Sequence, residues 1–270
     1  MSEKWSGRKA KPIPFVPDEL TLDYILDNED GKILLQQELI PVGYDIEEAE
    51  ILTIDIGKNF SYSILGYDQT GKTNMLKTLL RVIKSNFDWK VYVVDNGEGG
   101  LRRYSSKYNA DDYICDTASF DGFITPLVME MQARHKDLKA FRQNENAQSE
   151  YEYMRKYQRI VVLIDDFDGF FKMISDDALS YVENLLSGGS GLEVYFIFTA
   201  NPDKLKSYTS QPLYTSVFTG KSGILLGGNI DGQNIFNLSM NYQQRNCQYD
   251  AGTGYLIDRS EYKVIKTPFA

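Results

Sequence analysis

The chain has 270 residues, of which 42% are hydrophobic and 25% are charged, and its formal net charge is −9 at pH 7. This composition excludes disorder over the whole length and allows one α/β domain with a substantial core. The acidic balance argues against a surface that binds nucleic-acid phosphates, for which a basic domain is expected. Cys115 and Cys247 are too few and too far apart for a disulfide framework or a C-x-x-C metal site, so we expect buried thiols.

The N-terminal part is predicted to be a tether. Residues 1–20 are polar and hold three of the eight prolines, a composition typical of a linker to something upstream. A short helical segment is predicted over 22–26, and short β segments begin near residue 40. We therefore divide the chain into a tether, residues 1–40, and a main domain, residues 41–270.

Two further patterns concern the surface. The longest apolar runs, residues 160–164 and 194–198, are much too short to cross a bilayer, and the N-terminus has no signal-peptide pattern. We expect a soluble piece. The basic residues of 134–142 are interpreted as a solvated face, and so is the pair Arg102 and Arg103. The one histidine, His135, lies in this charged stretch and receives no catalytic role.

The strongest motif is G-x-x-x-x-G-K-T at residues 66–73. A short apolar run over 62–65 precedes it, and an amphipathic helix is predicted to follow. Strand, glycine-rich loop and helix in this order make a phosphate-binding loop, because loop amides and the positive helix end cradle phosphate oxygens. We expect Lys72 to reach the terminal phosphates of ATP and the Thr73 hydroxyl to help hold Mg²⁺. The residues predicted to bind the nucleotide are Gly66, Gly71, Lys72, Thr73 and Asn74.

One position weakens the loop motif. Many such loops carry another glycine two places before the Gly-Lys pair, and this chain has Gln69 there. A residue with a Cβ resists the positive φ angles that glycine adopts freely. We therefore expect reduced affinity for the nucleotide.

The next segments alternate between strand and helix. A buried strand is predicted over 89–95, a short strand over 113–115 and a long helix over 120–141, where apolar residues share one stripe. This βαβ alternation is typical of a parallel sheet, and predicts an α/β fold.

A second acidic motif follows the apolar run of residues 160–164. Asp165 and Asp166 end this predicted strand, where P-loop enzymes carry the aspartate that orients Mg²⁺. Adjacent acids also cap strand-to-loop turns, but the presence of a phosphate-binding loop in the same chain favours the Mg²⁺ role for Asp165. Asp166 stands where a glutamate commonly polarises the attacking water. Because it is one methylene shorter, we expect it to be a slow catalytic residue.

A last strand is predicted over 194–199. Active motors frequently place a polar sensor of the terminal phosphate at its tip, where this chain has Ala200. Thr199 and Asn201 are the only polar substitutes. We expect the loop after residue 65 and the acids after residue 164 to converge from the tips of neighbouring strands around a triphosphate.

The order of these parts resembles the FtsK/SpoIIIE-type motor domains. It is closest to the C-terminal ATPase domain of EssC-type coupling proteins, which are membrane-anchored and serve Gram-positive type VII secretion. The resemblance covers nearly the whole chain and rests on the segments 11–14, 66–80, 91–95, 165–167 and 252–258.

The resemblance implies a RecA/FtsK-like P-loop NTPase fold, a three-layer sandwich with a mostly parallel central sheet. It also implies a module at the cytoplasmic side of the membrane, held there by its parent protein, with neighbouring ATPase domains in the same chain and a hexameric assembly. The implied partners are small secreted helical proteins of the WXG type, and no nucleic acid. The departures at Gln69, Asp166 and Ala200 match a degenerate member that binds ATP weakly, hydrolyses little, and serves in substrate recognition.

Two other functions stay open. An active DNA translocase of the FtsK/SpoIIIE class is disfavoured by the acidic balance and by the lack of a basic, aromatic-rich segment. A small-molecule kinase is permitted by the phosphate loop, although no lid-like cluster of arginines is evident.

Overall fold

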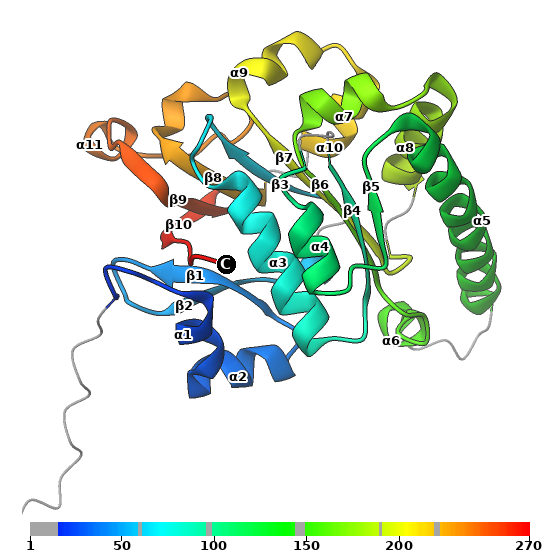
Figure 1. Ribbon diagram of the computed structural model, residues 1–270, viewed down its shortest axis with the longest axis horizontal. Helices are drawn as coiled ribbons and strands as arrows, with labels where there is room; N and C mark the ends of the chain where they lie inside the picture. Colours follow the sequence, from blue (N-terminus) through cyan, green and yellow to red (C-terminus); the bar gives the residue numbers. More distant parts are fainter. Residues whose placement is uncertain (1–15, 59–60, 96–98, 144–148, 189–190, 219–221) are drawn as a thin grey trace, which may run out of the picture.

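The structure is a computed structural model that describes residues 16–58, 61–95, 99–143, 149–188, 191–218 and 222–270. Within these residues, ten strands form one sheet in the order β2-β1-β10-β9-β8-β3-β7-β6-β4-β5 (Figure 1). The six strands from β8 to β5 are parallel, and β9, β10, β1 and β2 continue the sheet antiparallel. The predicted α/β fold with a mostly parallel sheet is confirmed.

The strands have these bounds: β1 (Ile40–Asp45), β2 (Ile51–Ile54), β3 (Ser61–Gly66), β4 (Lys90–Val94), β5 (Asp112–Ile114), β6 (Ile160–Ile164), β7 (Val194–Ala200), β8 (Ser222–Gly228), β9 (Tyr249–Asp258) and β10 (Glu261–Lys266). The α-helices are α1 (Leu22–Asp27), α2 (Glu29–Gln36), α3 (Lys72–Asn86), α4 (Arg102–Lys107), α5 (Thr117–Arg142), α6 (Glu150–Met154), α7 (Phe167–Met173), α8 (Asp176–Gly188), α9 (Pro202–Leu205), α10 (Pro212–Phe218) and α11 (Tyr242–Arg245).

Helices cover both faces of the parallel strands, which explains their continuous apolar sequences. Every residue of β6 and of β7 is buried. Alternate side chains point to opposite faces, so that Leu163 packs into the core under α3 while Val162 packs into the core under α5, α7, α8 and α10. The arrangement is a three-layer sandwich. No helix among the described residues has the length and apolar character needed to span a membrane.

Part of the predicted tether packs on the sheet. α1 and α2 lie against β1 and β2 (Figure 1), and Leu20, Leu22 and Ile25 are fully buried. Residues 1–15 lie outside the described residues. The division at residue 40 stays a prediction, and these contacts argue for placing the boundary before Leu20.

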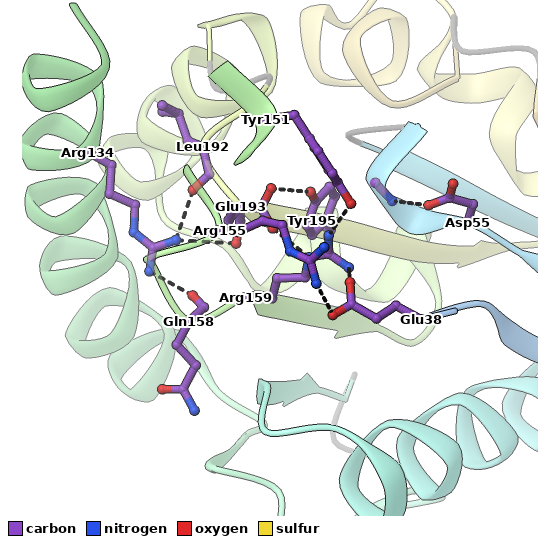
Figure 2. A network of polar contacts seen from close by, with 11 residues as sticks. Glu38, Asp55, Arg134, Tyr151, Arg155, Gln158, Arg159, Leu192, Glu193 and Tyr195 are labelled. Atoms are coloured by element: carbon purple, nitrogen blue, oxygen red, sulfur yellow. Dashed lines mark hydrogen bonds and ion pairs between the residues drawn. The ribbon is translucent and has the colours of Figure 1, made fainter. Parts of the chain in front are cut away.

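A polar network fixes the end of α2 to the start of the parallel strands (Figure 2). Arg159 and Glu193 directly precede β6 and β7, and their Nε and Oε2 atoms are 2.5 Å apart, with side chains only 6% and 3% exposed. Glu38, just after α2, forms ion pairs with Arg155 at 2.5 Å and with Arg159 at 3.2 Å. The segment after α2 is therefore connected to the parallel strands by an ion pair between the partly exposed Glu38 and the buried Arg159.

Two predictions about the surface are wrong in part. Arg134 is only 2% exposed, because its guanidinium donates to the carbonyls of Leu192 at 2.9 Å and Gln158 at 3.0 Å. The predicted solvated face holds at Arg142, which is exposed and pairs with Glu150. The two cysteines are half-buried rather than buried, because neither lies in the interior of a covered strand.

Candidate nucleotide-binding site

The loop of residues 66–73 joins β3 to α3. Gly71 precedes the helix with φ +106°, a left-handed conformation that glycine adopts without strain. A Cβ at Gly66 would lie 2.3 Å from Thr70 Oγ1 and 2.7 Å from the Leu226 carbonyl, so only glycine fits there. Among the described residues, no side chain caps α3. The amides of its first turn are therefore available to an anion, as a phosphate-binding loop requires.

Gln69 occupies the position where a glycine is common. Its φ is +62°, so the loop does adopt the left-handed conformation there. A non-glycine residue in this conformation costs about 1–2 kcal/mol. The sequence analysis therefore located the strained backbone correctly at Gln69. The effect of this strain on nucleotide affinity stays a prediction.

Lys72 and Thr73 point back toward the loop and across to β6. The Lys72 Nζ donates to the Tyr67 carbonyl at 2.6 Å, and Thr73 Oγ1 donates to Asp165 Oδ2 at 2.9 Å. Burial lowers the pKa of Lys72, against the opposite influence of Asp68 and Asp165. A hydroxyl and a carboxylate oxygen this close suit Mg²⁺, which prefers oxygen ligands and keeps several waters.

Asn74 is engaged elsewhere. Its Nδ2 donates to the Pro268 carbonyl at 2.7 Å, and its Oδ1 accepts from the Ala270 amide at 3.2 Å. It does not line the cavity described below. Its role in nucleotide binding stays a prediction, and the structure gives it a contact to the C-terminal segment.

The two acids after β6 have different surroundings. Asp165 accepts from Thr199 Oγ1 at 2.7 Å as well as from Thr73, and burial raises its pKa. Asp166 has φ +60° and directly precedes α7, and its Oδ2 is 3.5 Å from Lys204 Nζ. The hydroxyls fix both oxygens of Asp165, whereas the carboxylate of Asp166 faces a cation.

The phosphate loop and the acids are not on neighbouring strands, which corrects the sequence-based expectation. β7 lies between β3 and β6 and pairs in parallel with both. Ala200, at the tip of β7, is 1% exposed, and Asn201 donates to Asp68 Oδ1 in the phosphate loop at 3.0 Å. β7 and the residue that follows it thus contribute side chains to both motifs, Thr199 to Asp165 and Asn201 to Asp68.

One cavity of about 350 Å³ brings the motifs together. Its lining residues come from the phosphate loop, the end of β6 and the segment after β7: Asp68, Gln69, Lys72, Thr73, Asp165, Asp166, Asn201 and Lys204. Sequence reasoning missed Lys204, because it lies outside any motif, and Asp68, which it treated only as a loop position. The predicted residues Lys72, Thr73, Asp165 and Asp166 all reach this cavity.

Comparison with known proteins shows which sequences and structures this chain is similar to. No protein-family model matches the chain. A curated relative, the ESX secretion system protein YukB of Bacillus subtilis (strain 168), is 24% identical over 273 residues. That alignment covers 98% of this chain and 17% of YukB, so the chain spans about a sixth of the length of this relative.

Solved structures of two secretion ATPases are also similar. The cytoplasmic domain of EssC has a TM-score of 0.81 at 19% identity, with 97% of this chain and 49% of that chain covered. ATPases 2 and 3 of Thermomonospora curvata EccC, solved in complex with a signal sequence peptide, have a TM-score of 0.73 at 16% identity, with coverage of 98% and 46%. The predicted resemblance is confirmed: the chain has the fold of EssC/EccC ATPase domains and is similar in sequence to a type VII secretion protein.

Proposed function

We propose that this chain binds ATP with Mg²⁺ in the cavity beside the phosphate loop, with slow turnover or none, as an ATPase domain of a type VII secretion machine. The observation that carries the proposal is the convergence of Lys72, Thr73, Asp165 and Asp166 on one cavity. The ATPase fold of the similar structures supports nucleotide binding.

Each residue would have a separate task. The amides at the start of α3 and the Lys72 ammonium would hold the phosphates. Thr73 and Asp165 would hold Mg²⁺, which when bound neutralises phosphate charge and draws electrons from the terminal phosphorus. Asp166 would orient the attacking water.

Slow turnover follows from two features of the site. Asp166 is one methylene shorter than the glutamate common at this position, so its carboxylate reaches less far toward an attacking water. At the tip of β7, the buried Ala200 has no polar group to offer a terminal phosphate. These features favour a domain whose nucleotide is bound rather than rapidly consumed.

Calorimetric titration with Mg-ATP tests the proposal. We expect measurable but weak binding by the wild type and at least tenfold weaker binding by Lys72→Ala, since a charge-assisted contact to phosphate is lost. Lys77→Ala on the same helix is the control, because Lys77 lies over the Tyr104 ring rather than in the cavity. Turnover above about 1 per second, within the ordinary range of enzymes, would contradict the slow site.

The role in secretion is the second part of the proposal. We infer a domain of a membrane-anchored parent with tandem ATPases and a hexameric assembly, which recognises small secreted helical proteins of the WXG type. The similarity to YukB and the signal sequence peptide in the EccC complex support this reading. Direct binding of purified secreted proteins of this type to the chain tests it, and failure to bind any of them in the presence or absence of Mg-ATP would count against it.

A further inference from the structure

The cavity contains a second lysine that no sequence motif accounts for. Lys204 lies in α9, after β7, and lines the cavity together with Lys72. Its Nζ is 3.5 Å from Asp166 Oδ2 and 3.9 Å from Asp168 Oδ2, and its side chain is 44% exposed. These are long contacts for ion pairs, so the ammonium has room to move within the cavity.

Neighbouring lysines show that this placement is specific. Lys206, two residues further, pairs with Asp203 at 2.7 Å and does not line the cavity. Lys172 already pairs with Asp168 at 2.9 Å. Asp168 therefore has a closer partner than Lys204, and the remaining contact of Lys204 is with Asp166 in the cavity.

The negative charges in the cavity lining favour a second lysine beside Lys72 when a phosphate binds. Three aspartates, Asp68, Asp165 and Asp166, face two lysines in the lining. A triphosphate is strongly anionic, and each lysine that turns toward it offsets the repulsion from these carboxylates. Burial chiefly lowers the pKa of Lys72, and the charge of Lys204 adds to the lowering, which indicates that the two ammonium groups share one region.

We propose that Lys204 binds the terminal phosphate of ATP, and so distinguishes ATP from ADP in place of the polar side chain absent at Ala200. In the structure its ammonium lies beside the carboxylate of Asp166. When the third phosphate is present, the ammonium turns to it, because a phosphate oxygen accepts a stronger charge-assisted hydrogen bond than a carboxylate 3.5 Å away. This inference rests on the proposed function and deepens it by naming the specificity-determining residue.

Titration of wild type, Lys204→Ala and Lys206→Ala with Mg-ATP and with Mg-ADP tests the inference. We expect Lys204→Ala to lose about tenfold in ATP affinity while its ADP affinity changes less than about twofold. Lys206→Ala is the matched control on the same segment and should keep both affinities. Thermal unfolding of each variant confirms that it is folded.

The possible outcomes separate this inference from the proposed function. If the wild type binds neither nucleotide, the proposed function fails and the inference with it. Three results in a wild type that binds ATP would overturn the inference: Lys204→Ala loses affinity for ATP and ADP equally, it loses affinity for neither, or it gains affinity for ATP. In each case Lys204 does not bind the terminal phosphate. The proposed function would survive each of these three results.

Discussion

The Thr199 hydroxyl donates a hydrogen bond to Asp165, with its Oγ1 2.7 Å from Oδ1. Thr199 Oγ1 also accepts a hydrogen bond from the backbone amide of Asp166 at 2.7 Å, and Thr199 is fully buried. One side chain of the central strand β7 therefore orients both acids that follow β6. The geometry of the candidate Mg²⁺ site depends on a strand that belongs to neither nucleotide motif.

Thr199→Val should remove both bonds at nearly constant volume. The Asp166 amide loses its partner, and an unsatisfied buried group costs about 1–3 kcal/mol, so we expect a loss of this size in the free energy of unfolding. The affinity for ATP should also depend less on Mg²⁺, because Asp165 is less firmly oriented. Urea unfolding and titrations with and without Mg²⁺ measure the two effects. Thr199→Ser, which keeps the hydroxyl, should stay close to wild type, and equal stability of the Val and Ser variants would contradict the argument.

Asp165→Asn should show a characteristic pH dependence. Burial raises the pKa of Asp165 above its usual value of 3.8, so the protonated form is favoured in the folded state. The stability from this carboxyl is fully present below the unfolded pKa and is lost as the pH rises through the folded pKa. Asparagine does not ionise, so the variant should be more stable than wild type at pH 7.

The advantage of Asp165→Asn should shrink as the pH falls from 7 toward 4, because the wild-type carboxyl takes up its proton as the pH falls through its raised pKa. Urea unfolding at both pH values without nucleotide measures the difference, and Mg-ATP binding should be weakened in the same variant. An advantage that grows on acidification would mean that the carboxylate, rather than the acid, is the stabilised form.

Gln69→Gly should relieve the backbone of the phosphate loop. The left-handed conformation costs about 1–2 kcal/mol for a residue with a Cβ, and the added freedom of glycine in the unfolded chain takes back about 0.5–1 kcal/mol. We expect a net gain of about 0.5–1 kcal/mol in the free energy of unfolding and tighter Mg-ATP binding. Gln69→Ala is the control, since it removes the side chain but keeps the Cβ. A similar gain in both variants would place the effect in the side chain instead.

The sequence predicted those parts of the site that are formed by short, contiguous segments. The loop of residues 66–73 and the apolar strand before Asp165 were predicted because each is a local signal with a local structure. The insertion of β7 between β3 and β6 was not predicted, since strand order depends on long-range pairing. Helix periodicity placed α5, with its apolar stripe on one face, but could not foresee that Arg134 would be buried among backbone carbonyls.

The same limit explains Lys204. Nothing in its neighbours Asp203 and Leu205 marks it, and its position in the cavity follows from the turn of α9 after β7. Side chains that complete a site from a separate segment are visible only once the strands are placed.

The buried pair of Arg159 and Glu193 should be sensitive to loss of one partner. Arg159→Met leaves the Glu193 carboxylate buried without its guanidinium, and we expect a loss of about 3–5 kcal/mol in the free energy of unfolding. Removing both charges with Arg159→Met and Glu193→Leu should recover much of it. The exposed pair of Arg142 and Glu150 is the control, where Arg142→Met should cost far less stability, because water screens an exposed ion pair. Urea unfolding of the wild type and of these three variants gives the comparison, and a cost for Arg159→Met as small as that for Arg142→Met would contradict the argument.

The boundary of the domain can be located by deletion. Removing residues 1–15 should leave the free energy of unfolding unchanged, because the polar, proline-rich start is predicted to be a linker. Removing residues 1–39 also takes away Leu20, Leu22 and Ile25, and each buried side chain of this size contributes about 1.5–3 kcal/mol. It further leaves Arg159 without its contact to Glu38.

We therefore expect the longer deletion to lower the urea midpoint steeply or to prevent folding. Glu38→Gln in the full chain separates the loss of charge from the loss of apolar packing, and should have the smaller effect because the core under α1 and α2 stays covered. If the chain without residues 1–39 unfolds at the wild-type urea concentration, α1 and α2 belong to the tether, and the boundary lies at residue 40 as the composition predicts.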